Sequence, residues 1–163
     1  MKKPTIYATT SMVIPFRYSI SDVRRFVMVQ ERDTGTWNQP GGGLNLSDSD
    51  YLHACAREVR EETGLTVVPV HFVGVYSFNS LHGNFINNLA LATEEIEHGE
   101  LRALRDSDIA DVKPMTLEEI RELHSSGKLR SGRATLDVVE DYIRGIASGS
   151  LLSVRSVIHS CRI

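Results

Sequence analysis

The chain has 163 residues, of which 41% are hydrophobic and 24% charged, a composition typical of a globular protein long enough to bury a core. We therefore expect one domain over residues 1–163. The net charge of −3 argues against general electrostatic binding of nucleic acid. No apolar run approaches the ~18 residues of a membrane span, and no apolar segment follows the first lysines as in a signal peptide. We expect a cytoplasmic protein with no membrane partner.

The first part of the chain has the pattern of two strands and a loop. Residues Ile6–Pro15 and Arg25–Gln30 are rich in apolar and β-branched side chains, which favours strands, and the polar run between them suits a turn. Glycine and proline then punctuate residues 31–43, which indicates a loop.

A helix is expected between Asp50 and Gly64. Side chains at Ser47–Asp50 offer oxygens for the first N–H groups of a helix, and Gly64 suits the left-handed residue that ends one. At about 100° per residue, one stripe of this helix is apolar and should face a core; it consists of Leu52, Cys55, Ala56, Val59 and Thr63.

The second half of the chain mixes strands and helices. Three runs favour strands, namely Thr66–Phe78, Phe85–Ala92 and Val112–Met115. Two amphipathic runs favour helices, namely Thr116–Ser125 and Ala134–Ile146. Residues 150–163 fit either a helix or a strand. Mixed strands with helices on either side predict an α/β fold in which a mixed sheet lies between helical layers.

Three carboxylates of the expected helix, those of Glu58, Glu61 and Glu62, fall on one stripe beside the apolar one. Like charges at this spacing repel by roughly 0.2–0.5 kcal/mol per pair. An ordinary solvated face, with Arg57 and Glu61 as an i, i+4 ion pair, is the alternative. The preceding glycines favour a site, because they let the backbone approach a ligand, and clustered oxygens suit a hard divalent cation such as Mg²⁺.

The segment Arg57–Leu65, with the sequence REVREETGL, resembles the second half of the Nudix box, which reads R-E-U-x-E-E-x-G-U with U aliphatic. The glycines after Pro40 match the start of the box, which therefore covers about residues 42–65. One position differs, because Ser49 stands where the first family glutamate belongs when counting back from Arg57. Whether Asp48 or Asp50 replaces that glutamate stays open.

The resemblance implies a Nudix-type α/β/α sandwich and hydrolysis of a diphosphate bond in a nucleoside diphosphate derivative, with Mg²⁺, or alternatively Mn²⁺, as the cofactor. It implies metal ligation by the helix glutamates with a backbone carbonyl; these residues are Gly42, Glu58, Glu61 and Glu62. It also implies catalytic roles for Arg57, Glu58 and Glu61. The general base stays open between Glu58 and the later acids Glu100, Asp106 and Asp108.

Substrate contacts are less constrained by the sequence. Trp37 is a candidate for stacking on a base, with core packing as its alternative, and Arg32 is a candidate for a phosphate contact. The loss of the first box glutamate keeps a second function open, a catalytically weak or inactive domain that binds nucleotides as a sensor. The expected partner is a small nucleoside diphosphate derivative, and a homodimer is left open.

Overall fold

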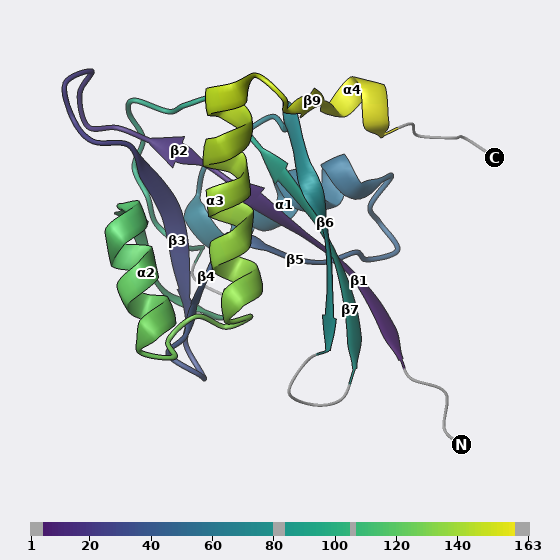
Figure 1. Cartoon of the computed structure of the whole chain (residues 1–163). Coiled ribbons are helices and arrows are strands. Elements are labelled where there is room, and N and C mark those ends of the chain that lie inside the picture. The colour runs from purple at the N-terminus through teal and green to yellow at the C-terminus, as the bar shows by residue number, and fades with distance from the viewer. Residues whose placement is uncertain (1–4, 80–83, 105–106, 159–163) are drawn as a thin grey trace.

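The computed structural model describes residues 5–79, 84–104 and 107–158. Its centre is a five-stranded sheet in the order β5-β1-β7-β6-β9 (Figure 1). The strands are β1 (Ile6–Val13), β5 (Gly41–Gly43), β6 (His71–Asn79), β7 (Phe85–Ala92) and β9 (Leu152–Ser153). Because β1 and β7 run parallel while the other neighbours are antiparallel, the sheet is mixed, as predicted.

A second, antiparallel sheet is built on β3 (Arg25–Glu31). Its other strands are β2 (Pro15–Phe16), β4 (Trp37–Asn38) and β8 (Ile109–Met115). The prediction of one continuous strand over Ile6–Pro15 is wrong, because the chain passes from the first sheet to the second at Ile14. The Ile14 carbonyl accepts a hydrogen bond from the Val27 N–H at 3.0 Å, and Pro15 has no N–H with which to continue the first ladder.

Other strand boundaries also differ from the predictions. The strand predicted at Thr66–Phe78 begins only at His71. Pro69, which has no N–H for a ladder, lies in the segment before it. The strand predicted at Phe85–Ala92 is confirmed, and the one at Val112–Met115 is longer, beginning at Ile109. Residues 31–43 are not wholly a loop, since they contain β4 and β5.

The helix α1 (Tyr51–Thr63) has the ends that the sequence predicts. The Oδ1 atom of Asp50 accepts a hydrogen bond from the His53 N–H at 2.9 Å, and Gly64 ends the helix with φ of 76°. The buried stripe gains one residue and loses two relative to the expected one. It contains Ala54 together with Cys55, Val59 and Thr63, whereas Leu52 and Ala56 are half-buried.

Three further helices follow β8. α2 (Leu117–Ser125) begins with a capping box between Thr116 and Glu119, and α3 (Arg133–Ser148) is the longest helix of the described chain. The described part of residues 150–163 holds both β9 and the short α4 (Val154–Val157). No helix in residues 5–79, 84–104 and 107–158 is long and apolar enough to cross a membrane.

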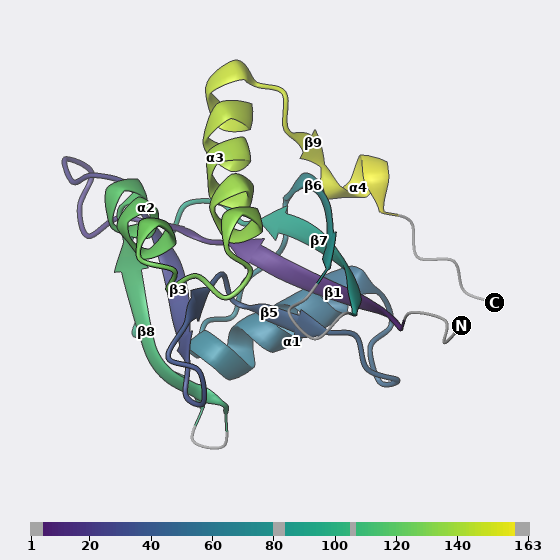
Figure 2. The ribbon, with the colours of Figure 1, turned by 60° about the horizontal axis from the view of Figure 1, so that its bottom comes forward.

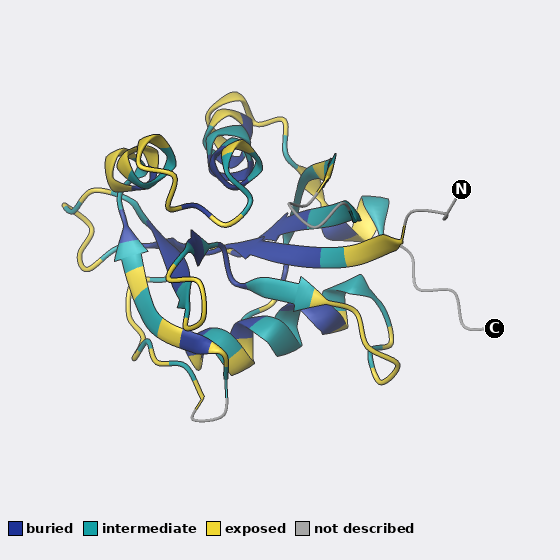
Figure 3. Ribbon diagram, turned by 90° about the horizontal axis from the view of Figure 1, so that it is seen from below, coloured by how far each residue is buried: buried dark blue, intermediate teal, exposed yellow. Residues whose placement is uncertain are grey.

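The helices form two layers around the sheets. α1 lies on one side of β1 and β5, whereas α2 and α3 lie on the opposite side (Figures 2 and 3). The central strand β1 serves both layers, because Val13 joins the core on the α3 side while Met12 and Ile14 join the core against α1. The arrangement is the predicted α/β fold with a mixed sheet between helical layers.

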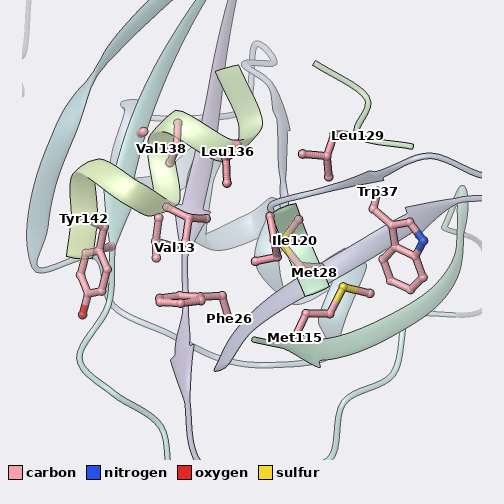
Figure 4. Packing of buried hydrophobic residues seen from close by; sticks show 13 residues of the cluster. Val13, Phe26, Met28, Trp37, Met115, Ile120, Leu129, Leu136, Val138 and Tyr142 are labelled. Atoms are coloured by element: carbon pink, nitrogen blue, oxygen red, sulfur yellow. The ribbon is translucent and has the colours of Figure 1, made fainter. Parts of the chain in front are cut away.

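The core on the α3 side also holds Trp37. Figure 4 shows its ring among Met28, Met115 and neighbouring apolar side chains. Trp37 is 7% exposed, and the ammonium group of Lys113 lies 5.7 Å from its ring centroid. Trp37 thus packs in the core, in agreement with its alternative as a packing residue, and the structure does not support stacking of a substrate base on its ring.

Candidate active site

The carboxylates of α1 lie against the glycine strand β5. The Gly41 N–H donates a hydrogen bond to Oε2 of Glu62 at 2.8 Å. A Cβ atom at Gly42 would lie 2.6 Å from Cδ of Glu58, and one at Gly41 would collide with the carbonyl oxygen of Thr10. Gly41 also has φ of 154°, which favours glycine. Because glycine has no side chain, β5 and the carboxylates of α1 can come into contact.

Burial disfavours the ionised form of two of these carboxylates. Burial raises the pKa of Glu62 to about 8, the Gly41 N–H opposes this shift, and the charges of Glu58 and Glu61 add to it. Burial also raises the pKa of Glu58, although the Arg57 guanidinium partly offsets the effect. A cation at this corner of the fold would favour the ionised form of both groups.

Arg57 joins the carboxylates to the preceding loop. Its Nη1 donates to Oε1 of Glu58 at 2.9 Å and to Oε2 of Glu61 at 3.2 Å. Its Nη2 donates to the carbonyl oxygen of Gly43 at 3.1 Å. The i, i+4 pair expected as the ordinary alternative is thus one contact of a larger network, in which Arg57 holds the orientation of two glutamates.

Asp48 anchors this arginine from the loop side. Its two carboxylate oxygens accept hydrogen bonds from Nε and Nη2 of Arg57 at 3.0 and 2.9 Å. The Asp48 side chain is 1% exposed, and the Arg57 guanidinium holds its pKa well below the usual range. Asp50, in contrast, caps α1. Of these two aspartates, Asp48 is therefore the one whose carboxylate contacts the box arginine.

The donor chemistry at this corner suits a hard divalent cation, because carboxylate and carbonyl oxygens meet there. Within residues 5–79, 84–104 and 107–158, no three acidic, histidine or cysteine side chains are already gathered as a set of metal ligands. The hydrogen bonds explain this, since Glu58 and Glu61 are turned to Arg57 while Glu62 is turned to Gly41. Burial raises the pKa values of Glu58 and Glu62, and a cation bound beside them would favour their ionised forms.

A cavity of about 850 Å³ adjoins the carboxylates and extends between the five-stranded sheet and the start of α3. Glu62 and β5 form one part of its wall. Aromatic and aliphatic side chains form another, namely those of Tyr76, Phe78, Ile86, Leu129 and Val138. Polar side chains complete it, among them Thr9, Ser11, Asn38, Gln39, Asn88, Arg130 and Thr135. Its size suits a small organic molecule.

The structure does not bring Arg32 to this cavity. Its Nη2 donates to the carbonyl oxygen of Ile109 at 2.8 Å, and it does not belong to the cavity wall, so the prediction of a phosphate contact is not supported. Arg130 belongs to the wall instead and pairs with Glu31 there. No sequence pattern indicates Arg130, because it reaches the cavity through the turn between α2 and α3.

The later acids considered as general base also lie away from the cavity wall. Glu100 and Asp108 are exposed and contribute nothing to it. Asp106 lies outside the described residues. Among the candidates within the described chain, Glu58 is the one in contact with the glycine strand.

Sequence and structure comparisons agree on the family. The model of the NUDIX domain matches residues 16–135. Phosphatase NudJ of Escherichia coli K12 is 39% identical over 56 residues, which cover 33% of this chain and 36% of NudJ. The chain thus matches about a third of the length of this curated relative.

Two solved structures share the fold. A NUDIX hydrolase from Nitrosomonas europaea aligns with a TM-score of 0.73 and 22% identity, covering 96% of this chain and 97% of that one. The NUDIX domain of Shewanella oneidensis NrtR, complexed with ADP ribose, aligns with a TM-score of 0.69 and 15% identity, covering 88% and 90%. Because the family model spans more than half of the chain, the predicted resemblance is confirmed, and the chain belongs to the Nudix hydrolase family.

Proposed function

We propose that this protein hydrolyses a diphosphate bond in a nucleoside diphosphate derivative and that it requires Mg²⁺, with Mn²⁺ as a substitute. The observation that carries the proposal is the contact between the α1 carboxylates and β5 at the edge of the cavity. A substrate in this cavity has room for its organic part between the sheet and α3, and its phosphates then reach the glycine strand. The ADP ribose in the NrtR domain supports a substrate of this class.

Glu58, Glu61 and Glu62 are the residues that would hold the cation, together with a backbone carbonyl of β5 such as that of Gly42. Bound Mg²⁺ supplies neutralisation of phosphate charge and a more acidic water. The protein itself provides the orientation. Arg57 fixes the carboxylates of Glu58 and Glu61, and Asp48 fixes Arg57.

Glu58 is the proposed general base. Its carboxylate is half-buried, it lies against Gly42, and burial raises its pKa toward the range in which a carboxylate accepts a proton effectively. Arg57 donates to one oxygen of this carboxylate, Oε1. The other oxygen, Oε2, is then the proposed acceptor for the proton of the attacking water.

A nucleotide-binding domain with weak or no catalysis is the second candidate. The observation in its favour is Ser49 at the position of the first family glutamate. The bidentate contact of Asp48 with Nε and Nη2 of Arg57 favours the enzyme, because it supplies a carboxylate partner to the arginine.

A hydrolysis assay separates the two functions. Purified protein is incubated with a panel of nucleoside di- and triphosphates, nucleotide sugars and ADP ribose, in Mg²⁺ and in EDTA, and phosphate-containing products are measured. We expect release of products with Mg²⁺ and none in EDTA. Saturable binding of a panel member with no turnover in either Mg²⁺ or Mn²⁺ would instead establish the sensor.

A further inference from the structure

The side-chain amide of Gln39 is buried at the cavity. Gln39 is 3% exposed and lines the cavity at the end of β4, directly before Pro40. The backbone here is fixed, because the carbonyl oxygen of Pro40 accepts a hydrogen bond from the Met12 N–H at 2.8 Å. The position of Gln39 therefore depends on the sheet rather than on a mobile loop.

The first turn of α3 sets the orientation of this amide. Nε2 of Gln39 donates to the carbonyl oxygen of Thr135 at 2.6 Å. Turning the amide around would place Oε1 against that carbonyl oxygen, two acceptors facing each other, so the observed orientation is the stable one. Oε1 accepts no hydrogen bond from any residue within 5–79, 84–104 and 107–158. Oε1 is not among the buried side-chain atoms of the described chain that lack a partner, so it is open to the cavity that Gln39 lines.

Other polar groups of the wall are engaged with one another. Oδ1 of Asn88 accepts from the Thr9 hydroxyl at 3.1 Å, and Nδ2 of Asn88 donates to the Ser11 hydroxyl at 2.8 Å. Oδ1 of Asn38 accepts from the Thr135 hydroxyl at 2.9 Å. Against this background, Oε1 of Gln39 is an acceptor that remains available to a ligand.

The surroundings of Gln39 fit a flat heteroaromatic ring. Leu129, which bridges to Trp37, and Val138, one turn of α3 after Thr135, give the cavity an apolar wall for the faces of such a ring. α3 begins at Gly132 without a side-chain cap, and Gly132 lines the same cavity, so N–H groups at this end of the helix favour an acceptor atom nearby. A base with an amino group next to a ring nitrogen offers a donor for Oε1 of Gln39 and an acceptor for the N–H groups at the start of α3.

We propose that Oε1 of Gln39 is a specificity-determining acceptor, which selects substrates whose base carries an exocyclic amino group. The inference rests on the proposed function, because it assigns the base end of the same cavity. It predicts that the protein discriminates between substrates at the base, far from the phosphates. The chemistry at the α1 carboxylates is the same for a base with or without the amino group.

The test compares matched pairs of substrates. Hydrolysis is measured for ATP against purine riboside triphosphate, and for CTP against the triphosphate of 2-pyrimidinone riboside, each analogue lacking only the amino group. We expect kcat/KM of the wild-type protein to be at least about tenfold higher for the amino compound of at least one pair, chiefly through KM. In Gln39→Met the ratio should fall to within about threefold of one.

Gln30→Met is the matched control. Gln30 also donates its side-chain amide to a backbone carbonyl, that of Gly35 at 2.9 Å, but it does not line the cavity. This variant should keep the wild-type ratio. Equal kcat/KM within both pairs in the wild-type protein, which needs no variant to fold, would overturn the inference. Full selectivity in Gln39→Met would overturn it as well.

The two proposals fail in different ways. Turnover of any of the four compounds that is lost in Glu61→Gln supports the proposed function, whatever the ratios are. If the wild-type protein turns over none of the four compounds but hydrolyses another member of the panel, the inference about Gln39 is overturned and the proposed function stands.

Discussion

The α1–β5 corner and the adjoining cavity are assembled in opposite ways. The corner is local in sequence, because β5 and the carboxylates of α1 fall within residues 41–62, and it is charged. The cavity joins distant segments through neutral groups, as in the bond between Gln39 and Thr135, which are 96 positions apart. Under the proposed function, the groups that act on the phosphates therefore come from one short segment, whereas recognition of the rest of the substrate depends on the whole fold.

The two regions also differ in how their polar groups are balanced. At the corner, burial and like charges raise the pKa values of Glu58 and Glu62, so the ionised forms of these groups are disfavoured in the protein alone. In the cavity, the amides and hydroxyls of Thr9, Asn88 and Ser11 satisfy one another. Changes at the corner should therefore alter rate and metal dependence, and changes in the cavity should alter the choice of substrate.

Substitutions among the three consecutive glycines should have the largest effects on stability and activity. In Gly41→Ala the new Cβ meets the Thr10 backbone, which cannot move without disturbing the sheet, so we expect a loss of about 3 kcal/mol or more in the free energy of unfolding. In Gly42→Ala it meets the Glu58 carboxyl group, which can turn away. That variant should fold normally and lose activity.

Gly43→Ala is the control for both glycine variants, since a Cβ there meets no atom within 4 Å. Urea denaturation and steady-state kinetics on the three proteins provide the measurement. Full activity in Gly42→Ala would contradict the contact between Glu58 and the glycine strand as a requirement for catalysis.

Glu61→Gln should lower kcat by at least about 10²-fold. The change removes a negative charge that would hold the cation, and the cation is needed to neutralise phosphate charge in the transition state. The fold should be unaffected, since the Glu61 side chain is 48% exposed. Glu118→Gln on α2, whose side chain is 75% exposed, is the matched control and should behave as wild type. Near-normal turnover of Glu61→Gln at saturating Mg²⁺ would remove Glu61 from the site.

The Glu62 carboxyl group should make stability depend on pH and on Mg²⁺. Its pKa is about 8 in the folded protein against an ordinary value of 4.5. Between these values the folded state keeps a proton that the unfolded state has released, so stability should fall as the pH rises through this window. Mg²⁺ binds the ionised form and should restore stability, by about 2.7 kcal/mol at a hundred times its Kd.

Thermal melting from pH 5 to pH 9, with and without Mg²⁺, checks this expectation. Glu62→Gln should flatten the decline with pH and reduce the effect of Mg²⁺. A stabilisation by Mg²⁺ that is larger at pH 5 than at pH 8 would argue against carboxylate ligands.

Local patterns account for what the sequence predicted well. The caps of α1 at Asp50 and Gly64, and the strand at Phe85–Ala92, follow from propensities within each segment. The box itself brought together Arg57 and its glutamates, because they lie on one helix. What could not be predicted depends on contacts between segments far apart. The burial of Trp37 and the arrival of Arg130 at the cavity both follow from the pairing of β4 with the α2–α3 turn, seen in the bridge between Trp37 and Leu129.

The sequence does contain a pattern that indicates part of the cavity wall, the polar residues of β1. Thr9 and Ser11 lie two positions apart in β1, so their side chains share the face that carries Val13 farther along the strand. Polar side chains on a face that should be buried indicate a ligand or a partner. The partner of both hydroxyls, Asn88, could be placed beside them only once the parallel pairing of β1 and β7 was known.

The smallest effects separate the two aspartates of the loop. Asp48 is the residue that supports the arginine, so Asp48→Asn should lower turnover about tenfold, the size typical of losing a group that orients metal ligands. Its near-complete burial means that the melting temperature should fall as well. Because the pKa of Asp48 is lowered in the folded state, its contribution to stability should be lost only as the pH falls below the ordinary value of 3.8.

Asp50 acts on the helix alone. Its Oδ1 accepts from the His53 N–H, and Asp50→Ala should cost about 1 kcal/mol of stability, the usual value for losing an N-cap, with turnover unchanged at a temperature where the variant is folded. Asp50→Ser keeps a capping oxygen and should recover most of that loss. Melting curves and kcat for the Asp48 and Asp50 variants provide the comparison. If Asp50→Ala lowered kcat while Asp48→Asn did not, the support of Arg57 would have to be reassigned to Asp50, and the contact between Asp48 and Arg57 would be a structural ion pair of the loop.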